Sequence, residues 1–102
     1  MAQPSILELV GRIDNVTSAA VDSRINAALD GTPSALVIDF AGITFVSSVG
    51  LRVLLMAAKR CQKQNARLAL YAVSPQIAEL FSLSGLKTIL PTYPDQAAAL
   101  TA

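Results

Sequence analysis

The sequence predicts a single α/β domain in which about four mostly parallel or mixed strands alternate with four helices. Segments rich in Val, Ile and Leu alternate along the chain with segments whose apolar residues recur at helical spacing. Such alternation is typical of a sheet whose parallel strands are joined by right-handed crossovers. A length of 102 residues suits one core, so residues 1–102 are interpreted as one domain.

The first half of the chain is expected to form a strand, a helix and a second strand. Residues 6–10 are apolar except for one glutamate and predict a short strand that continues to a turn at 11–14. Residues 16–29 have helical spacing, and the segment 30–33 ends the pattern. Residues 35–40 form a nearly continuous apolar run, which is typical of a strand covered on both faces. The candidate caps of the first helix are Asp14, Asn15 and Thr17.

The centre of the chain predicts a strand that leads directly into an amphipathic helix. Residues 43–46 precede the paired serines Ser47 and Ser48, and from Val49 to about residue 64 apolar residues recur at every third or fourth position. Either serine can cap the helix, because a serine oxygen accepts a hydrogen bond from an unpaired backbone N–H group. This junction of strand and helix is the predicted functional site.

The second half is expected to repeat the alternation with shorter elements. Residues 67–73 predict a strand, Ser74 and Pro75 predict the start of a helix that ends near residue 84, and residues 86–90 predict a last short strand. Residues 91–94 are read as a turn or extended segment, and Asp95 is expected to cap a terminal helix at 96–100. In a parallel sheet the strand-to-helix junctions lie at one edge, so 14–15, 47–48, 74–75 and 93–95 are expected to converge.

Composition excludes several classes of partner. Hydrophobic residues make up 53% of the chain and charged residues 15%, which excludes intrinsic disorder. The formal net charge is +1 without any run of like charges, so nucleic acid is not an expected partner. No apolar run reaches the roughly 20 residues of a membrane-spanning helix, and no signal-peptide pattern is present. A cytoplasmic protein without direct membrane insertion is expected.

Catalysis is poorly supported, so the protein is not expected to be an enzyme. The chain has no histidine to activate a serine, no glycine-rich phosphate loop and no metal-ligand spacing. Neither a metal nor a cofactor is therefore expected. The single cysteine, Cys61, lies on an apolar helical face and is read as a core residue. Asp14 and Asp39 are candidates to meet at the sheet edge, although strand-end aspartates more often cap helices.

A structural cap is the default reading of Ser47 and Ser48 from the residues alone, and Gly50 adds some weight to a function at this junction. A glycine in the first turn of a helix costs about 1 kcal/mol relative to alanine. Its presence therefore suggests that another backbone, or a binding partner, approaches the helix closely at this point.

Several segments together resemble the STAS domain of anti-sigma factor antagonists. One of them starts at residue 38 and reads IDFAGITFVSSVGLRVLL, and its part from residue 39 to residue 55 is the most specific. The others are residues 11–14, 67–70, 74–75, 83–86 and 93–95, so the resemblance covers nearly the whole chain. In that family the domain binds an anti-sigma factor that is also a serine kinase of the GHKL type. The kinase phosphorylates a serine at the start of the second helix, and a serine phosphatase restores the unmodified form.

The resemblance implies an anti-sigma factor antagonist that acts by partner switching. Ser48 aligns with the phosphorylated serine, and Ser47 is the second choice. Ser47 stands where the family often has an aspartate, which removes one charge near the acceptor, and Val49 is bulkier than the usual serine or alanine. The residues expected to bind the partner are Asp14, Ser47, Ser48, Val49, Gly50, Leu51 and Arg52.

Two alternative functions remain open. The domain could be a constitutive STAS docking subunit of an ABC-type lipid transport or sensory complex, in which no phosphate is needed. A small hydrolase or nucleotide-binding protein is the alternative from another class, and the missing catalytic base disfavours it. Family members usually carry an extra strand before residues 6–10. An edge strand is therefore expected to be shortened or absent here, with a homodimer as one way to cover the exposed margin.

Overall fold

Four strands and four helices alternate along the chain in the computed structural model, which describes residues 2–102. Met1, part of the predicted domain, lies outside the described residues. The strands form one sheet in the order β1-β2-β3-β4, and all three pairings are parallel, so the predicted alternation and the parallel sheet are confirmed. The elements are β1 (Ser5–Ile13), α1 (Ser18–Asp30), β2 (Ala35–Val46), α2 (Ser48–Lys63), β3 (Arg67–Tyr71), α3 (Pro75–Leu83), β4 (Thr92–Tyr93) and α4 (Gln96–Thr101).

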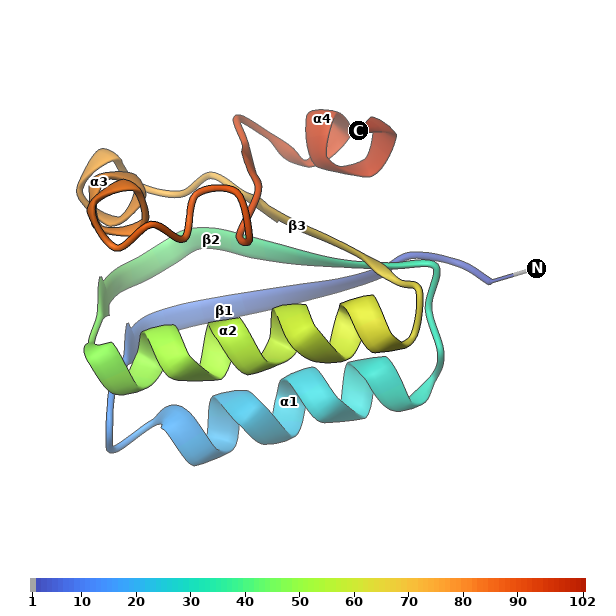
Figure 1. The fold of residues 1–102 in the computed structure, drawn as a ribbon, viewed down its shortest axis with the longest axis horizontal. Helices are drawn as coiled ribbons and strands as arrows, with labels where there is room; N and C mark the ends of the chain where they lie inside the picture. Colours follow the sequence, from blue (N-terminus) through green and yellow to red (C-terminus); the bar gives the residue numbers. More distant parts are fainter. Residues whose placement is uncertain (1) are drawn as a thin grey trace.

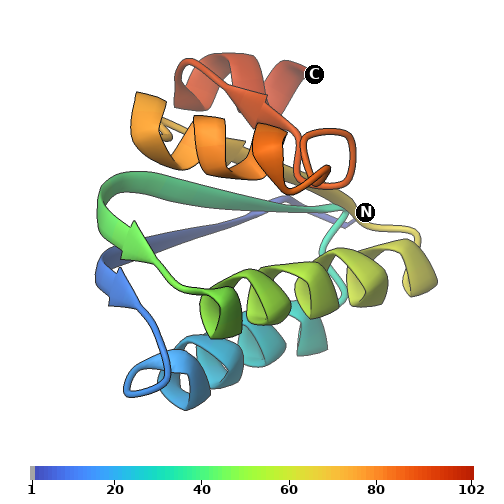
Figure 2. The same cartoon turned by 60° about the vertical axis from the view of Figure 1, so that its left-hand side comes forward.

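The helices cover the two faces of the sheet unequally. In Figures 1 and 2, α1 and α2 lie side by side beneath the sheet, and α4 lies on its other side. Leu36 and Ile38 of β2 belong to the larger core between the sheet and helices α1 and α2, whereas Val37 packs with Ala99 of α4. Because successive side chains of a strand point to opposite faces, the apolar run at the start of β2 supplies both layers. The strand is therefore covered on both faces, as its sequence predicts.

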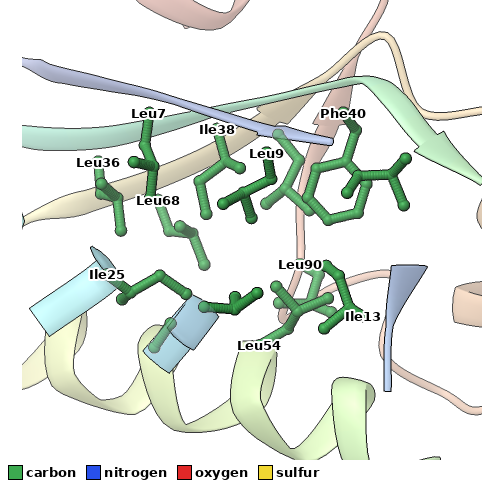
Figure 3. Close-up of a cluster of buried hydrophobic side chains, with 14 of the residues drawn as sticks. Leu7, Leu9, Ile13, Ile25, Leu36, Ile38, Phe40, Leu54, Leu68 and Leu90 are labelled. Carbon is green, nitrogen blue, oxygen red and sulfur yellow. The ribbon is translucent and has the colours of Figure 1, made fainter. Parts of the chain in front are cut away.

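The larger core lies between the sheet and the helix pair. Figure 3 shows Leu9 and Ile38 pointing from the strands toward Ile25 of α1 and Leu54 of α2, and all four are buried. At one end of this core, Phe40 of β2 meets Phe81 of α3 in an edge-to-face arrangement with ring centroids 6.4 Å apart. Aromatic pairs in this geometry stabilise a core beyond their burial alone.

β2 is longer than the sequence predicts, and its two halves differ. The inner half, residues 35–39, pairs with β1 on one side and with β3 on the other. The outer half, residues 40–46, pairs only with β1. Two β-bulges interrupt this pairing, and at each of them β2 has one extra residue relative to β1. The pattern of buried residues is regular in the inner half and broken in the outer half. Each such bulge bends a strand and turns its side chains in new directions.

Three local predictions were wrong. The first helix begins at Ser18 rather than 16, because the Asp14 carboxylate accepts hydrogen bonds from the backbone N–H groups of Val16 and Thr17 and holds 14–17 in a turn. Thr17 stands at the cap position, but its side chain makes no cap hydrogen bond. The third strand ends at Tyr71 instead of 73.

The predicted strand at 86–90 is a series of turns, which was the third error. The N–H groups of Ile89 and Leu90 both donate to the carbonyl oxygen of Leu86, at 3.0 and 2.8 Å, and Leu90 is fully buried in the core. The last strand is instead Thr92–Tyr93, in the segment that was read as a turn or extended chain. Within residues 2–102, none of the helices has the length and apolar character needed to cross a membrane.

Candidate functional site

Ser47 is the residue that caps α2. Its backbone is extended, and its Oγ accepts a hydrogen bond of 3.1 Å from the N–H of Gly50. Its carbonyl oxygen accepts from the N–H of Leu51 at 2.8 Å. The side chain of Ser47 therefore accepts from an N–H group of the first turn that has no partner within the helix. Its carbonyl oxygen accepts the first backbone hydrogen bond of the helix.

Ser48 is the first residue of α2, and its side chain is exposed. Among residues 2–102 its hydroxyl group makes no hydrogen bond, in contrast to that of Ser47. The first turn of α2 contains no acidic residue, so no side chain of that turn neutralises the positive end of the helix dipole. The structure therefore presents an accessible hydroxyl group at an electropositive helix end.

The start of α2 is packed directly on the end of β1. The N–H of Ser47 donates to the carbonyl oxygen of Ile13 at 2.9 Å. A Cβ atom on Gly50 would collide with the same carbonyl oxygen and would lie 3.0 Å from Cγ2 of Ile13. The close approach expected from the cost of a glycine in the first turn is thus confirmed. The approaching backbone belongs to this chain.

Of the residues at the start of α2 that were predicted to bind the partner, some lie at the surface and others in the core. Ser48, Val49 and Arg52 are exposed, and Val49 has 37% of its surface accessible. Gly50 is buried, and Leu51 is half-buried against the larger core. The surface available to a partner therefore combines a hydroxyl group, an apolar side chain and one cation.

Asp14 lies beside this surface at the end of β1 and is tightly held. Its carboxylate accepts from the N–H groups of Val16 and Thr17 at 2.9 and 3.2 Å, and from Nε of Arg12 at 3.1 Å. The hydrogen bond from Arg12 is the largest cause that lowers the pKa of Asp14; burial opposes it, and the two backbone hydrogen bonds add to the lowering. Asp14 is therefore a fixed anion near the start of α2.

Arg12 and Phe45 extend the site and were not predicted from the sequence. The guanidinium group of Arg12 lies 4.2 Å from the centre of the Phe45 ring, in a cation–π contact, and both residues are exposed. They face each other because the second bulge brings Arg12 into register with Phe45. No local sequence pattern reports this register.

The predicted convergence of the four junctions is only partly correct. Residues 14 and 47 come together through Ile13 and Val46, which are register partners at the ends of β1 and β2. β3 ends at Tyr71, whose partner is Asp39 in the middle of β2. The junctions at 74–75 and 93–95 therefore do not reach the end of the sheet at which residues 14 and 47 meet. There Ser74 and Asp95 cap their own helices by accepting from backbone N–H groups.

Asp39 and Asp14 do not meet. Asp39 is aligned with Glu8 rather than with the end of β1. Its carboxylate accepts a 2.8 Å hydrogen bond from the N–H of Ala41. Among residues 2–102 no group of three His, Cys, Asp or Glu side chains is placed to hold a metal ion.

Comparison with known proteins assigns the family. The STAS domain profile matches residues 2–99. The chain is 30% identical over 97 residues to an anti-sigma F factor antagonist of Paenibacillus polymyxa, covering 94% of this chain and 83% of that protein.

Solved structures show the same fold in proteins of different function. An anti-sigma factor antagonist from Mycobacterium paratuberculosis superimposes with a TM-score of 0.87 at 33% identity, over 99% of this chain and 86% of that one. A sulfate transporter family protein from Wolinella succinogenes shares the fold at 20% identity, with a TM-score of 0.81 over 96% and 82% of the two chains. The chain belongs to the STAS domain family, and its relatives in sequence and structure include anti-sigma factor antagonists.

Proposed function

We propose that this protein is an anti-sigma factor antagonist that acts by partner switching. The surface at the start of α2 binds an anti-sigma factor that is also a serine kinase of the GHKL type, and phosphorylation of Ser48 releases it. A serine phosphatase restores the binding form. The observation that carries the proposal is the exposed hydroxyl group of Ser48, without a hydrogen-bond partner among residues 2–102, at the first position of α2.

The different surroundings of the two serines favour Ser48 as the acceptor. Oγ of Ser47 is half-buried and already bonded to the N–H of Gly50. A kinase that modified Ser47 would have to break this cap, which typically contributes about 1 kcal/mol to helix stability. Ser48 can lose its hydroxyl proton and accept the phosphoryl group from ATP without disturbing a contact of the folded protein.

Phosphorylation would change the charge of the binding surface more than its shape. A phosphate adds about −1.5 to −2 charge at neutral pH. The N-terminus of α2 stabilises such a charge in the isolated protein. In a complex, the phosphate would sit beside Val49 in a close-packed interface and would lose its hydration. We therefore expect release of the partner without loss of the fold.

Affinity capture from the native lysate tests the proposal. The unmodified protein and its Ser48→Ala and Ser48→Asp variants serve as baits, with Lys87→Ala, remote in sequence from the helix start, as a control. Mass spectrometry identifies the bound proteins and any phosphate on Ser48. A GHKL-type kinase should bind the unmodified, Ser48→Ala and control baits and not the Ser48→Asp bait, whose melting temperature should stay unchanged.

Two results would contradict this proposal. Equal binding of a transporter or sensor component to every bait would favour a constitutive docking subunit. A melting temperature of Ser48→Asp that falls together with its binding would show that the charge disrupts the fold rather than the interface.

A further inference from the structure

β1 forms an open edge of the sheet. It has β2 on one side and, among residues 2–102, no strand on the other. The carbonyl oxygen of Gln3, just before β1, accepts from the N–H of Ser34 at 3.1 Å, so odd-numbered residues direct their backbone groups toward β2. Because this direction alternates along a strand, the N–H and C=O groups of Ile6, Glu8 and Val10 point outward. Such a row of unpaired backbone groups is a template for another strand.

The side chains of Ile6, Glu8 and Val10 are also uncovered. They lie on the face of the sheet opposite to α1 and α2, because Leu7 and Leu9 between them point into the larger core. Ile6 is 48% exposed and Val10 is 67% exposed. This margin of the sheet therefore offers apolar side chains together with the free backbone groups.

Two opposite charges on this face have unused bonding capacity. The carboxylate of Glu8 makes no hydrogen bond or ion pair among residues 2–102, and Glu8 is aligned with a second acid, Asp39 of β2. Arg12 is held by Asp14 through Nε and lies over the Phe45 ring, whereas its Nη1 and Nη2 make no hydrogen bond in the described part of the chain. At roughly 3.3 Å per residue, Glu8 and Arg12 are about 13 Å apart, too far to pair with each other.

We propose that two copies of this chain pair through β1 in antiparallel orientation, with Val10 opposite the same residue of the second copy. In this register Glu8 of each copy faces Arg12 of the other, so the two-fold interface contains two ion pairs on either side of the paired valines. The charges identify the occupant of the edge as a second copy, because each copy supplies both the acid and the cation. The register that puts Glu8 opposite Glu8 is disfavoured by repulsion, so Glu8 also selects the pairing.

Sedimentation velocity of the full chain over a concentration series tests the proposal. The unmodified protein should show a reversible equilibrium between monomer and dimer. Val10→Lys sets two cations opposite each other and should weaken the dimer at least about tenfold. Glu79→Arg, at an exposed position of α3, should leave the dimer unchanged. In hydrogen exchange, the amides of Glu8 and Val10 should become protected only as the dimer forms.

Exchange of the two charges gives the sharpest test. Glu8→Arg and Arg12→Glu should each weaken self-association at least about tenfold, because like charges then face each other. An equimolar mixture of the two variants should dimerise again, since the arginine introduced at position 8 meets the glutamate introduced at position 12, and Arg12 of the first variant meets Glu8 of the second. Circular dichroism establishes that each variant is folded.

Three results would overturn the proposal. They are a dimer that survives Val10→Lys, a mixture of folded charge variants that fails to associate, and a chain that stays monomeric at every concentration, which would leave the edge to another protein. Glu8 and Val10 are exposed, so their variants keep the fold and decide the proposal even if Arg12→Glu unfolds. The oligomeric state is measured without an anti-sigma factor, so failure here leaves the proposed function untouched.

Discussion

The inner and outer halves of β2 have different roles in the same strand. The inner half lies between two strands and supplies side chains to both layers of the fold. The outer half has one neighbour, two bulges and several exposed residues, and it ends at the serine junction. Phe40, Ile43 and Val46 still anchor the outer half in the larger core, and the candidate site lies where β2 extends beyond the third strand.

The two halves also differ in the kind of contact that positions them. The inner half is held by side-chain packing, as the full burial of Val37 shows. The outer half leads into α2, and backbone contacts fix the start of this helix. The N–H of Ser47 donates to the carbonyl oxygen of Ile13, and Gly50 packs against the same carbonyl group. Paired substitutions test this difference.

Truncation in the inner half should have the largest effect. Ile38→Ala removes a side chain that is 1% exposed and leaves a cavity, so the free energy of unfolding should fall by about 2–5 kcal/mol. Phe45→Ala in the outer half removes a ring that is 41% exposed, together with its contact to Arg12, and should cost about 1 kcal/mol. Denaturant unfolding measures both. Equal losses would show that the two halves contribute alike.

A methyl group at Gly50 should strain the start of α2. The Ile13 carbonyl group is part of the backbone and cannot turn away, so Gly50→Ala should destabilise the protein by about 1–3 kcal/mol. Gly31→Ala is the matched control, because its Cβ would lie 3.6 Å from the Ala28 carbonyl oxygen, an ordinary contact. Thermal or chemical unfolding of the pair measures the difference. Similar stability of the two variants would contradict the tight packing on β1.

The two adjacent serines should differ by the energy of one helix cap. Ser47→Ala removes the acceptor of the Gly50 N–H and should cost about 1 kcal/mol. Ser48→Ala removes an exposed hydroxyl group and should change stability by less than about 0.5 kcal/mol. Unfolding curves of both variants decide the point. The assignment of roles is wrong if Ser48→Ala is the more damaging change.

The smallest effect should come from Asp14 and depend on pH. Its folded pKa is lowered from 3.8, so its stabilising contribution is present above that pH and is lost as the pH falls through the folded value. Asp14→Asn should therefore be less stable than the unmodified protein near neutral pH, and the gap should narrow in acid. Arg12→Gln should raise the pKa of Asp14, which carboxyl NMR can follow. An unchanged pKa in Arg12→Gln would rule out the Arg12 contact as the main cause.

Features with a local physical signal were predictable from the sequence. Ser74 and Asp95 cap their helices as expected, because a capping residue shows itself by its type and its place before a helical pattern. Gly50 was informative because a glycine in a helix has a known cost. The inner half of β2 was predicted because an uninterrupted apolar run is typical of a doubly covered strand.

Features that depend on distant partners were not predictable. The contact between Arg12 and Phe45 follows from two bulges whose positions only the pairing of β1 with β2 determines. Residues 86–90 are apolar enough for a strand, but Leu90 is drawn into the core and the chain turns to place it there. At this position tertiary packing outweighs the local preference for a strand.

The main-chain attachment of α2 to Ile13 has a consequence for how such domains can diversify. The side chains at 48, 49 and 52 are exposed and take no part in the main-chain contacts that attach α2 to Ile13. Replacing them therefore leaves the position of the helix unchanged. Several copies of this scaffold can therefore carry different recognition surfaces. Under the proposed function, repulsive substitutions at those positions would stop one copy from binding the partner of another at little cost in folding.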